Sequence, residues 1–208
     1  MMENFQYYAP TKVVFGKGTE NKAGQLVKEQ NCRKVLIHYG SGSVKRSGLL
    51  DRIFASLDEE GISYISLGGV VPNPRLSLVY EGIDLCRREG VDFILAVGGG
   101  SVCDYAKAVS VSVYCEEDPW EKYYLKMEDV SCKIVPVGCV LTMVGTGSEM
   151  NGGAVITNHS QKRKIGHVFG DQVFPKFAIL NPRYTFTLPK YQMVAGFYDI
   201  FNHITEQY

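Results

Sequence analysis

The sequence predicts an α/β fold in which a parallel β-sheet is covered by helices on both faces. Between residues 34 and 98, apolar strand-like runs alternate with segments of helical spacing. The connections are short and marked by glycine, as expected when helices join consecutive parallel strands. Runs such as 91–98 (VDFILAVG) have the length and branching of a strand buried on both faces.

The elements follow one another in a regular order. We expect strands at 12–16, 34–40, 62–69 and 91–98, alternating with helices at 21–30, 44–61 and 76–90. Val102, Ala106, Val109 and Val113 recur at three- and four-residue steps and predict a further helix. Sheets of this kind bind ligands at the carboxyl ends of their strands, so the site is expected there.

The pattern changes after residue 132. Segments 132–158 and 162–182 are rich in β-branched residues, glycine and proline and predict further strands and hairpins. Segment 188–208 returns to helical spacing, with an apolar stripe of Val194, Phe197, Tyr198 and Phe201. This helix reaches the last residue without a glycine stop or polar tail, which is unusual for the end of a complete domain.

Composition restricts the classes of function. The chain has 22 acidic and 22 basic residues and 45% hydrophobic residues, which favours a globular protein without nucleic-acid or membrane partners. No apolar stretch reaches transmembrane length, and the first ten residues lack the apolar core of a signal peptide. The six cysteines form no CxxC pair, which favours a cytoplasmic protein, and four of them lie in or beside predicted elements and are expected to be small hydrophobes.

A glycine triplet at residues 98–100 follows the strand at 91–98. Glycine at this position permits positive φ and lets a backbone or ligand approach closely, and the next helix start favours an anion such as phosphate. Ser101 is the expected helix cap, while Asp104 either completes the cap or holds a ligand hydroxyl. The triplet alone also fits an ordinary turn.

Two other strand ends carry small polar residues. Gly40, Ser41 and Ser43 follow the strand at 34–40, with Lys45 and Arg46 close behind and no carboxylate at the strand end. That composition favours the 2′-phosphate of NADP over the bare ribose of NAD, although a serine-capped helix also fits. Thr142 and Thr146 follow a later strand and offer donors to phosphate or ribose, or form a turn.

Asp199 and His203 lie four residues apart on the terminal helix and therefore share one face. A carboxylate and an imidazole can bind a divalent cation, but they supply only two of about four ligands. From spacing alone, a surface hydrogen bond fits this pair better.

Four motifs, taken in order, resemble the iron-containing alcohol dehydrogenase family, and specifically its butanol dehydrogenase-like branch. They are GGGSVCDYAK (98–107), TMVGTGSEMN (142–151), FPKFAILNP (174–182) and AGFYDIFNHITEQY (195–208). The resemblance runs from Phe5 to the last residue. It implies a Rossmann-like nucleotide domain at 1–188 and the beginning of an all-α domain at 189–208.

The resemblance also implies functional residues. Gly98, Gly99, Gly100 and Ser101 would cradle a pyrophosphate with support from Asp104, while Thr142, Thr146, Lys164 and Leu180 would border the cofactor. Asp199 and His203 would be the first two ligands of Fe²⁺ or Zn²⁺. Gly40 stands where NAD-using relatives tend to carry aspartate, and Asn181 replaces an aspartate in a local turn.

The implied activity is hydride transfer between NADP(H), less so NAD(H), and a short-chain alcohol or aldehyde, with a homodimer expected for the full-length enzyme. The family places two further histidine ligands beyond residue 208, and the chain covers roughly half of a usual member. The resemblance therefore implies a fragment or a truncated product, which alone is expected to bind dinucleotide without turnover. A non-catalytic nucleotide-binding module and a glycerol dehydrogenase-like sister enzyme are the alternatives.

Overall fold

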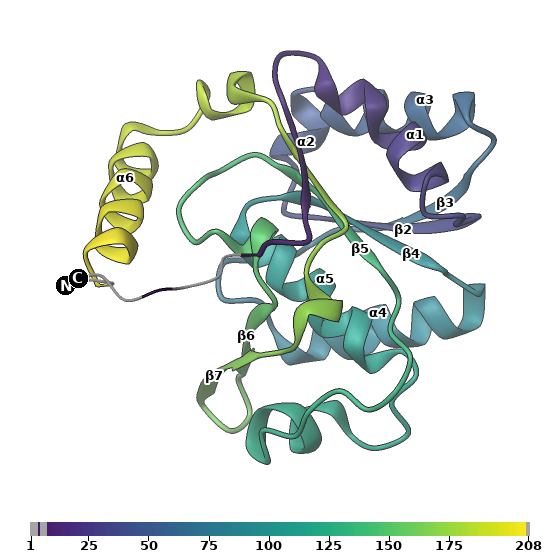
Figure 1. Cartoon of the computed structure of the whole chain (residues 1–208), viewed down its shortest axis with the longest axis vertical. Helices are drawn as coiled ribbons and strands as arrows, with labels where there is room; N and C mark the ends of the chain where they lie inside the picture. The colour runs from purple at the N-terminus through teal and green to yellow at the C-terminus, as the bar shows by residue number, and fades with distance from the viewer. Residues whose placement is uncertain (1–3, 5–7, 207–208) are drawn as a thin grey trace.

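The computed structural model describes residue 4 and residues 8–206, and its centre is a six-stranded sheet (Figure 1). Residues 1–3, 5–7 and 207–208 lie outside the described residues. The expectation of no signal peptide and the last two residues of the predicted terminal helix fall on that part of the chain.

The sheet is parallel throughout, in the order β1-β8-β5-β4-β2-β3. From β2 the chain continues to its outer neighbour β3, at one edge of the sheet. From β4 it continues to β5, in the opposite direction across the sheet. The topological switch point, where ligands bind such sheets, therefore lies between β2 and β4. The strands are β1 (Lys12–Phe15), β2 (Lys34–Tyr39), β3 (Ser63–Leu67), β4 (Phe93–Gly98), β5 (Val137–Leu141) and β8 (Phe177–Leu180).

Helices cover both faces of the sheet, as predicted (Figure 1). Leu36 and Ile94 face α4 (Leu76–Glu89) and α5 (Gly100–Ser112), whereas Val35 and Phe93 face α1 (Ala23–Lys28) and α3 (Leu49–Glu59). Successive strand residues alternate between the two cores, so a central strand such as β4 is apolar and buried at every position. The two cores explain the continuous apolar runs of the sequence.

One predicted helix is wrong in its extent. The segment 44–61 forms two helices, α2 (Ser43–Arg46) and α3, because Gly48 between them is left-handed with φ +67°. A left-handed residue cannot continue a right-handed helix. The chain therefore turns at Gly48.

The sequence assigned no element between Val113 and Cys132. Here the structure forms a π-helix, η2, whose aromatic side chains Trp120, Tyr123 and Tyr124 are buried, and both tyrosines lie edge-on to Phe169. Short 3₁₀ turns complete the connections. The short elements are η1 (Thr19–Lys22), η2 (Trp120–Leu125), η3 (Ser148–Met150), η4 (Asp171–Val173) and η5 (Pro182–Thr185).

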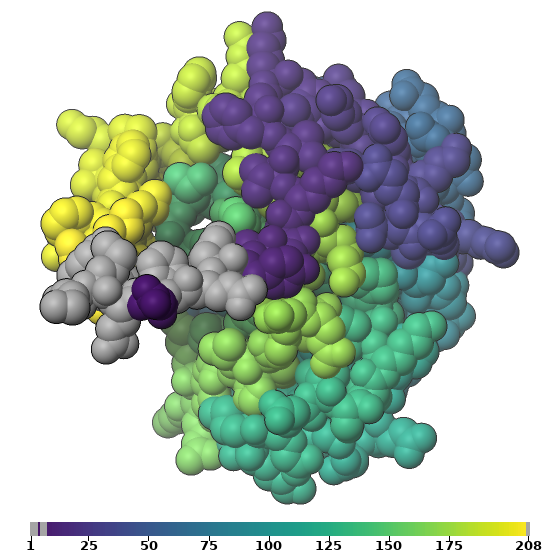
Figure 2. All heavy atoms as spheres, viewed as in Figure 1, coloured from purple at the N-terminus to yellow at the C-terminus, as the bar shows by residue number. Residues whose placement is uncertain are grey.

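The carboxyl-terminal third adds an antiparallel hairpin and a detached helix. The hairpin, β6 (Gly153–Asn158) and β7 (Arg163–Val168), confirms the predicted change of pattern. Helix α6 (Lys190–Thr205) stands apart from the sheet, at one margin of the molecule (Figures 1 and 2). Its predicted apolar stripe is 54–66% exposed. Within the described residues, no helix combines the length and apolar character that a bilayer crossing requires.

Candidate functional site

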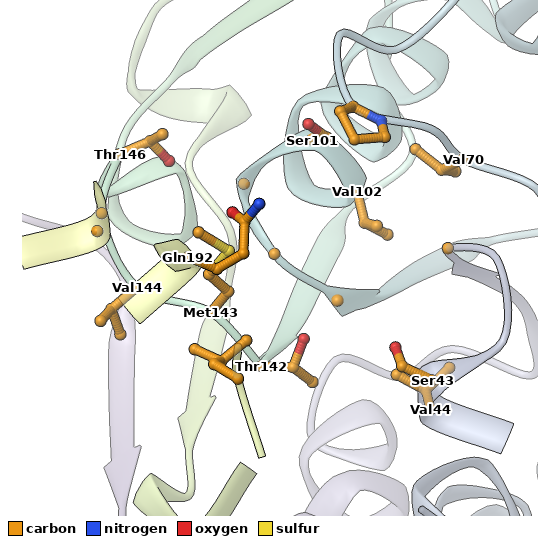
Figure 3. Close-up of a pocket in the computed structure, with 18 of the residues that line it drawn as sticks. Ser43, Val44, Val70, Ser101, Val102, Thr142, Met143, Val144, Thr146 and Gln192 are labelled. Carbon is orange, nitrogen blue, oxygen red and sulfur yellow. The ribbon is translucent and has the colours of Figure 1, made fainter. Parts of the chain in front are cut away.

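A cleft of about 550 Å³ opens at the carboxyl ends of β2, β3, β4 and β5, and α6 forms its far side (Figure 3). Its size is typical of sites for small molecules and cofactors. The sequence predicted this edge of the sheet, and the cleft includes nine of its proposed cofactor residues. These are Gly40, Ser41, Ser43, Gly98, Gly99, Gly100, Ser101 and both threonines, Thr142 and Thr146, with the metal candidate Asp199 as a further wall.

The glycine turn joins β4 to α5. Gly98 ends the strand, Gly99 is the N-cap, and the amides of Val102 and Cys103 donate the first helical hydrogen bonds to the Gly99 oxygen. The amides of Gly100 and Ser101 come before those bonds. Amides at a helix start, together with the helix dipole, favour an anion.

The physical reason predicted for the three glycines is wrong in one respect. Gly99 has φ −90°, and neither Gly98 nor Gly100 is left-handed. The glycines are needed for close packing instead: a Cβ on Gly98 would lie 2.5 Å from Val102 Cγ2, and one on Gly100 would overlap the Thr146 hydroxyl. The predicted close approach occurs, but the atoms that approach Gly98 and Gly100 are side-chain atoms of Val102 and Thr146, not a backbone or a ligand.

Ser101 and Asp104 do not cap α5. The helix begins at Gly100, so Ser101 lies inside its first turn. The Asp104 carboxylate accepts hydrogen bonds from Ser148 Oγ (2.5 Å) and the Val155 amide (3.1 Å), and it is not part of the cleft wall. Burial raises the pKa of Asp104, although Lys107 and these two donors oppose the shift.

The segment after β2 forms the other side of the switch point. Gly42 has φ +140°, and α2 begins at Ser43. Lys45 Nζ lies 4.9 Å from the centre of the Tyr39 ring, which places a cation beside the end of β2. The segment therefore presents small polar groups at one end of the cleft, while Lys45 lies beside the same strand end, outside the cleft wall.

The segment after β5 contacts α6 through two glycines. A Cβ on Gly196 would lie 2.8 Å from the Val144 oxygen, and one on Gly145 would lie 3.0 Å from Asp199 Oδ2. Gly196 is buried, although its neighbours on α6 are exposed. Because neither Gly145 nor Gly196 has a side chain, α6 can approach the segment after β5 and form the cleft wall.

Lys164 and Leu180 lie outside this wall. Lys164, on β7, lines a neighbouring hollow of about 400 Å³ that shares Val71 and Pro72 with the cleft. Leu180 ends β8 and pairs with Phe15 and Leu141 in the sheet. Their predicted places beside the nicotinamide stay predictions.

Asp199 and His203 meet on one face of α6. His203 Nε2 lies 3.7 Å from Asp199 Oδ1. The His203 side chain is 55% exposed and the Asp199 side chain is 44% exposed. Their donor chemistry suits a divalent metal. Among the described residues, however, no group of three or more His, Cys, Asp or Glu side chains gathers at one point. The pair supplies two of about four ligands and does not make a complete metal site by itself.

Four of the cysteines are buried in surroundings that do not activate a thiol. Cys86, Cys103, Cys115 and Cys139 are buried and free, and burial raises the pKa of Cys86 to about 12. A neutral buried thiol is a poor nucleophile. The prediction that these residues act as small hydrophobes is confirmed for all four.

Sequence reasoning missed part of the cleft wall. Residues 70–72 follow β3, and a glycine- and proline-rich stretch at that strand end was a usable signal. Gln192, Ala195 and Gly196 reach the cleft from α6, and Figure 3 shows the Gln192 side chain projecting into it. No local pattern marked them, because only the approach of α6 to Val144 brings them there.

Comparison with known proteins agrees with this geometry. The family model of iron-containing alcohol dehydrogenase matches residues 10–182. The chain is 45% identical over 207 residues to NADH-dependent butanol dehydrogenase A of Clostridium acetobutylicum, covering 100% of this chain and 52% of that protein. It is 40% identical over 209 residues to the NADPH-dependent aldehyde reductase YqhD of Escherichia coli, with the same coverage.

A solved structure shares the fold. NADH-dependent butanol dehydrogenase A from Thermotoga maritima superposes with a TM-score of 0.93 at 45% identity, covering 99% of this chain and 51% of that one. The chain thus spans about half the length of the curated relatives it matches.

Proposed function

The chain belongs to the iron-containing alcohol dehydrogenase family, and we propose that it provides the dinucleotide site of an enzyme that transfers hydride between NADP(H) and a short-chain alcohol or aldehyde. The observation that carries the proposal is the helix start at Gly100, which opens into a cleft at the switch point of the sheet. Helix starts at this position hold the pyrophosphate of dinucleotides.

In this proposal the cofactor extends along the cleft in a defined direction. The diphosphate binds the Gly100 and Ser101 amides, the adenosine ribose lies near Gly40, Ser41 and Ser43, and the nicotinamide lies towards Thr142, Thr146 and α6. Lys164 and Leu180 are proposed to border the nicotinamide ribose from outside the present wall. The chain's own contribution to catalysis is to fix the nicotinamide relative to the substrate.

The preference for NADP(H) rests on the segment after β2. No carboxylate follows Tyr39, and Lys45 beside the Tyr39 ring offers a positive charge to a 2′-phosphate. The relatives' names include both cofactors, NADH for the butanol dehydrogenase and NADPH for the aldehyde reductase. The substrate class, a small alcohol or aldehyde, is carried over from the same names.

Asp199 and His203 are proposed as part of a site for Fe²⁺ or Zn²⁺. A divalent metal held near the nicotinamide supplies Lewis acidity to the substrate oxygen. The pair supplies two of about four ligands. Because the described residues gather no group of three or more such donors, a nucleotide-binding module without turnover is the second candidate.

The setting of the enzyme belongs to the same proposal. Six free cysteines fit a reducing compartment, so we keep the cytoplasm as its location. A homodimer stays a prediction for the full-length enzyme.

Calorimetric titration of the chain with NADPH and NADH tests the proposal. We expect both nucleotides to bind at one site, NADPH at least about tenfold more tightly, because the 2′-phosphate gains a charge-assisted contact. Butanal reduction followed by NADPH absorbance separates the two candidates. If neither NADPH nor NADH binds, both candidate functions are overturned. Tighter binding of NADH than of NADPH would overturn the assigned cofactor preference.

A further inference from the structure

Helix α5 reaches the segment after β5 through a buried lysine. Lys107 is fully buried. Its ammonium group donates to the Ser148 oxygen at 2.8 Å, to the Asn151 oxygen at 3.1 Å and to Asn151 Oδ1 at 2.9 Å. An ammonium group has three hydrogens, so all of them are used within residues 148–151.

Asp104 holds the same segment one helical turn earlier. One carboxylate oxygen accepts from Ser148 Oγ and the other from the amide of Val155, the third residue of β6. Lys107 Nζ lies 3.9 Å from Asp104 Oδ1, so the two charges also compensate each other. Together the two side chains fix the chain from Ser148 to Val155 against α5.

The fixed segment continues directly into the cleft wall. The Ser148 amide donates to Thr146 Oγ1 at 3.3 Å, and Thr146 packs against the bare face of Gly100. The next residues towards β5 contact α6, with Gly145 beside Asp199 and the Val144 oxygen beside Gly196. The position of residues 144–146 therefore depends on where Ser148 is held.

The composition of this segment explains why strong anchors are needed. Residues 145–153 include four glycines, two of which, Gly145 and Gly147, have positive φ. Glycine-rich backbone loses the most conformational freedom when it is ordered. Buried charges are costly unless they are fully hydrogen-bonded, and in return they restrict their partners to one geometry.

We propose that Asp104 and Lys107 are positioning residues of the cofactor site, which hold residues 144–148 so that Thr146 and the α6 wall face the nicotinamide half of the dinucleotide. This inference rests on the proposed function and deepens it. Neither side chain contacts the cofactor in this account. It replaces the role implied by the resemblance, in which Asp104 supports the pyrophosphate.

Two measurements on the chain with Lys107→Met test the inference. Hydrogen–deuterium exchange reports the anchoring without any ligand, and we expect the amides of residues 142–151 to exchange at least about tenfold faster while β2 and β4 stay protected. Calorimetry then compares NADPH with adenosine 2′,5′-bisphosphate, which lacks the nicotinamide half. NADPH affinity should fall at least about tenfold, and that of the bisphosphate by less than about threefold.

Two further variants make the test specific. Ser110→Ala removes a buried hydrogen bond from the same helix to the Val135 oxygen and should change neither local exchange nor the ratio of the two affinities. Asp104→Asn keeps the size and one acceptor, so it replaces Lys107→Met if that variant does not fold, with the same direction expected.

Each outcome has a definite meaning. Wild-type exchange rates at residues 142–151 in Lys107→Met, or an equal loss of affinity for both nucleotides, would overturn the positioning role. If the unchanged chain binds neither nucleotide, the proposed function and the positioning role both fail, while exchange still shows whether Lys107 anchors the segment.

Discussion

Gly40 shows how a single missing side chain can determine which cofactor fits. It begins the turn after β2 at one side of the cleft, and a Cβ built there would lie 3.4 Å from the Val70 oxygen, an ordinary contact. Its φ is not left-handed, so other residues can take its place without backbone strain. The position is therefore open to an aspartate, the residue that would contact an unphosphorylated ribose.

We predict that Gly40→Asp reverses the cofactor preference. The new carboxylate repels a 2′-phosphate and accepts hydrogen bonds from a ribose hydroxyl, so NADPH affinity should fall at least about tenfold while NADH affinity holds or rises. Calorimetric titration of both nucleotides measures this ratio. Gly40→Asn is the matched control, because it has the same shape without the charge. An unchanged ratio in the aspartate variant would place the ribose elsewhere.

At the scale of elements, a buried carboxylate joins three separate parts of the chain. Glu20 of η1 accepts hydrogen bonds from the Tyr184 hydroxyl and from Asn181 Nδ2 at 2.8 Å, and it pairs with Arg52 of α3 at 3.2 Å. Asn181 Oδ1 also accepts from the Arg183 amide, which confirms its predicted role in a local turn. Because position 181 is asparagine and not aspartate, its side-chain amide can also donate a hydrogen bond to Glu20.

The pKa of Glu20 makes this junction sensitive to acid. Burial raises the pKa, but the hydrogen bonds from Tyr184 and Asn181 and the charge of Arg52 outweigh it, and the net pKa lies below the ordinary value of 4.5. A carboxyl group with a lowered pKa stabilises the fold above its unfolded pKa. That contribution is lost as the pH falls below about 4.5 and through the folded pKa.

We predict that Glu20→Gln lowers the free energy of unfolding by about 2 kcal/mol at neutral pH, the usual worth of hydrogen bonds to a charged group. The difference from the unchanged chain should shrink as the pH falls below about 4.5 and through the lowered pKa of the folded state, because the wild-type carboxylate then becomes protonated. Urea unfolding at both pH values measures it. Glu29→Gln, in an exposed pair with Lys12, is the control and should change little. A constant difference across this range would mean that Glu20 carries no charge in the fold.

At the scale of the whole molecule, the sheet was predictable and the cleft only in part. Strand-helix alternation and continuous apolar runs are local patterns, and they located β2, β3 and β4 within a few residues. The family resemblance, carried by four ordered motifs, agrees with the matched family. The features that the sequence did not predict depend on contacts that local sequence patterns do not contain.

Three features depended on contacts between distant segments. The π-helix at Trp120–Leu125 is held by aromatic packing on Phe169, and its own spacing is irregular. The true partners of Asp104 lie 44 and 51 residues away, so spacing alone could not separate its roles. The α6 wall exists because Gly196 meets the Val144 oxygen.

A structure of the chain crystallised with NADPH tests the central claim most directly. We predict that the diphosphate oxygens accept hydrogen bonds from the amides of Gly100 and Ser101, with the nicotinamide directed towards Asp199. A nucleotide bound elsewhere, or one whose nicotinamide points away from α6, would contradict the account.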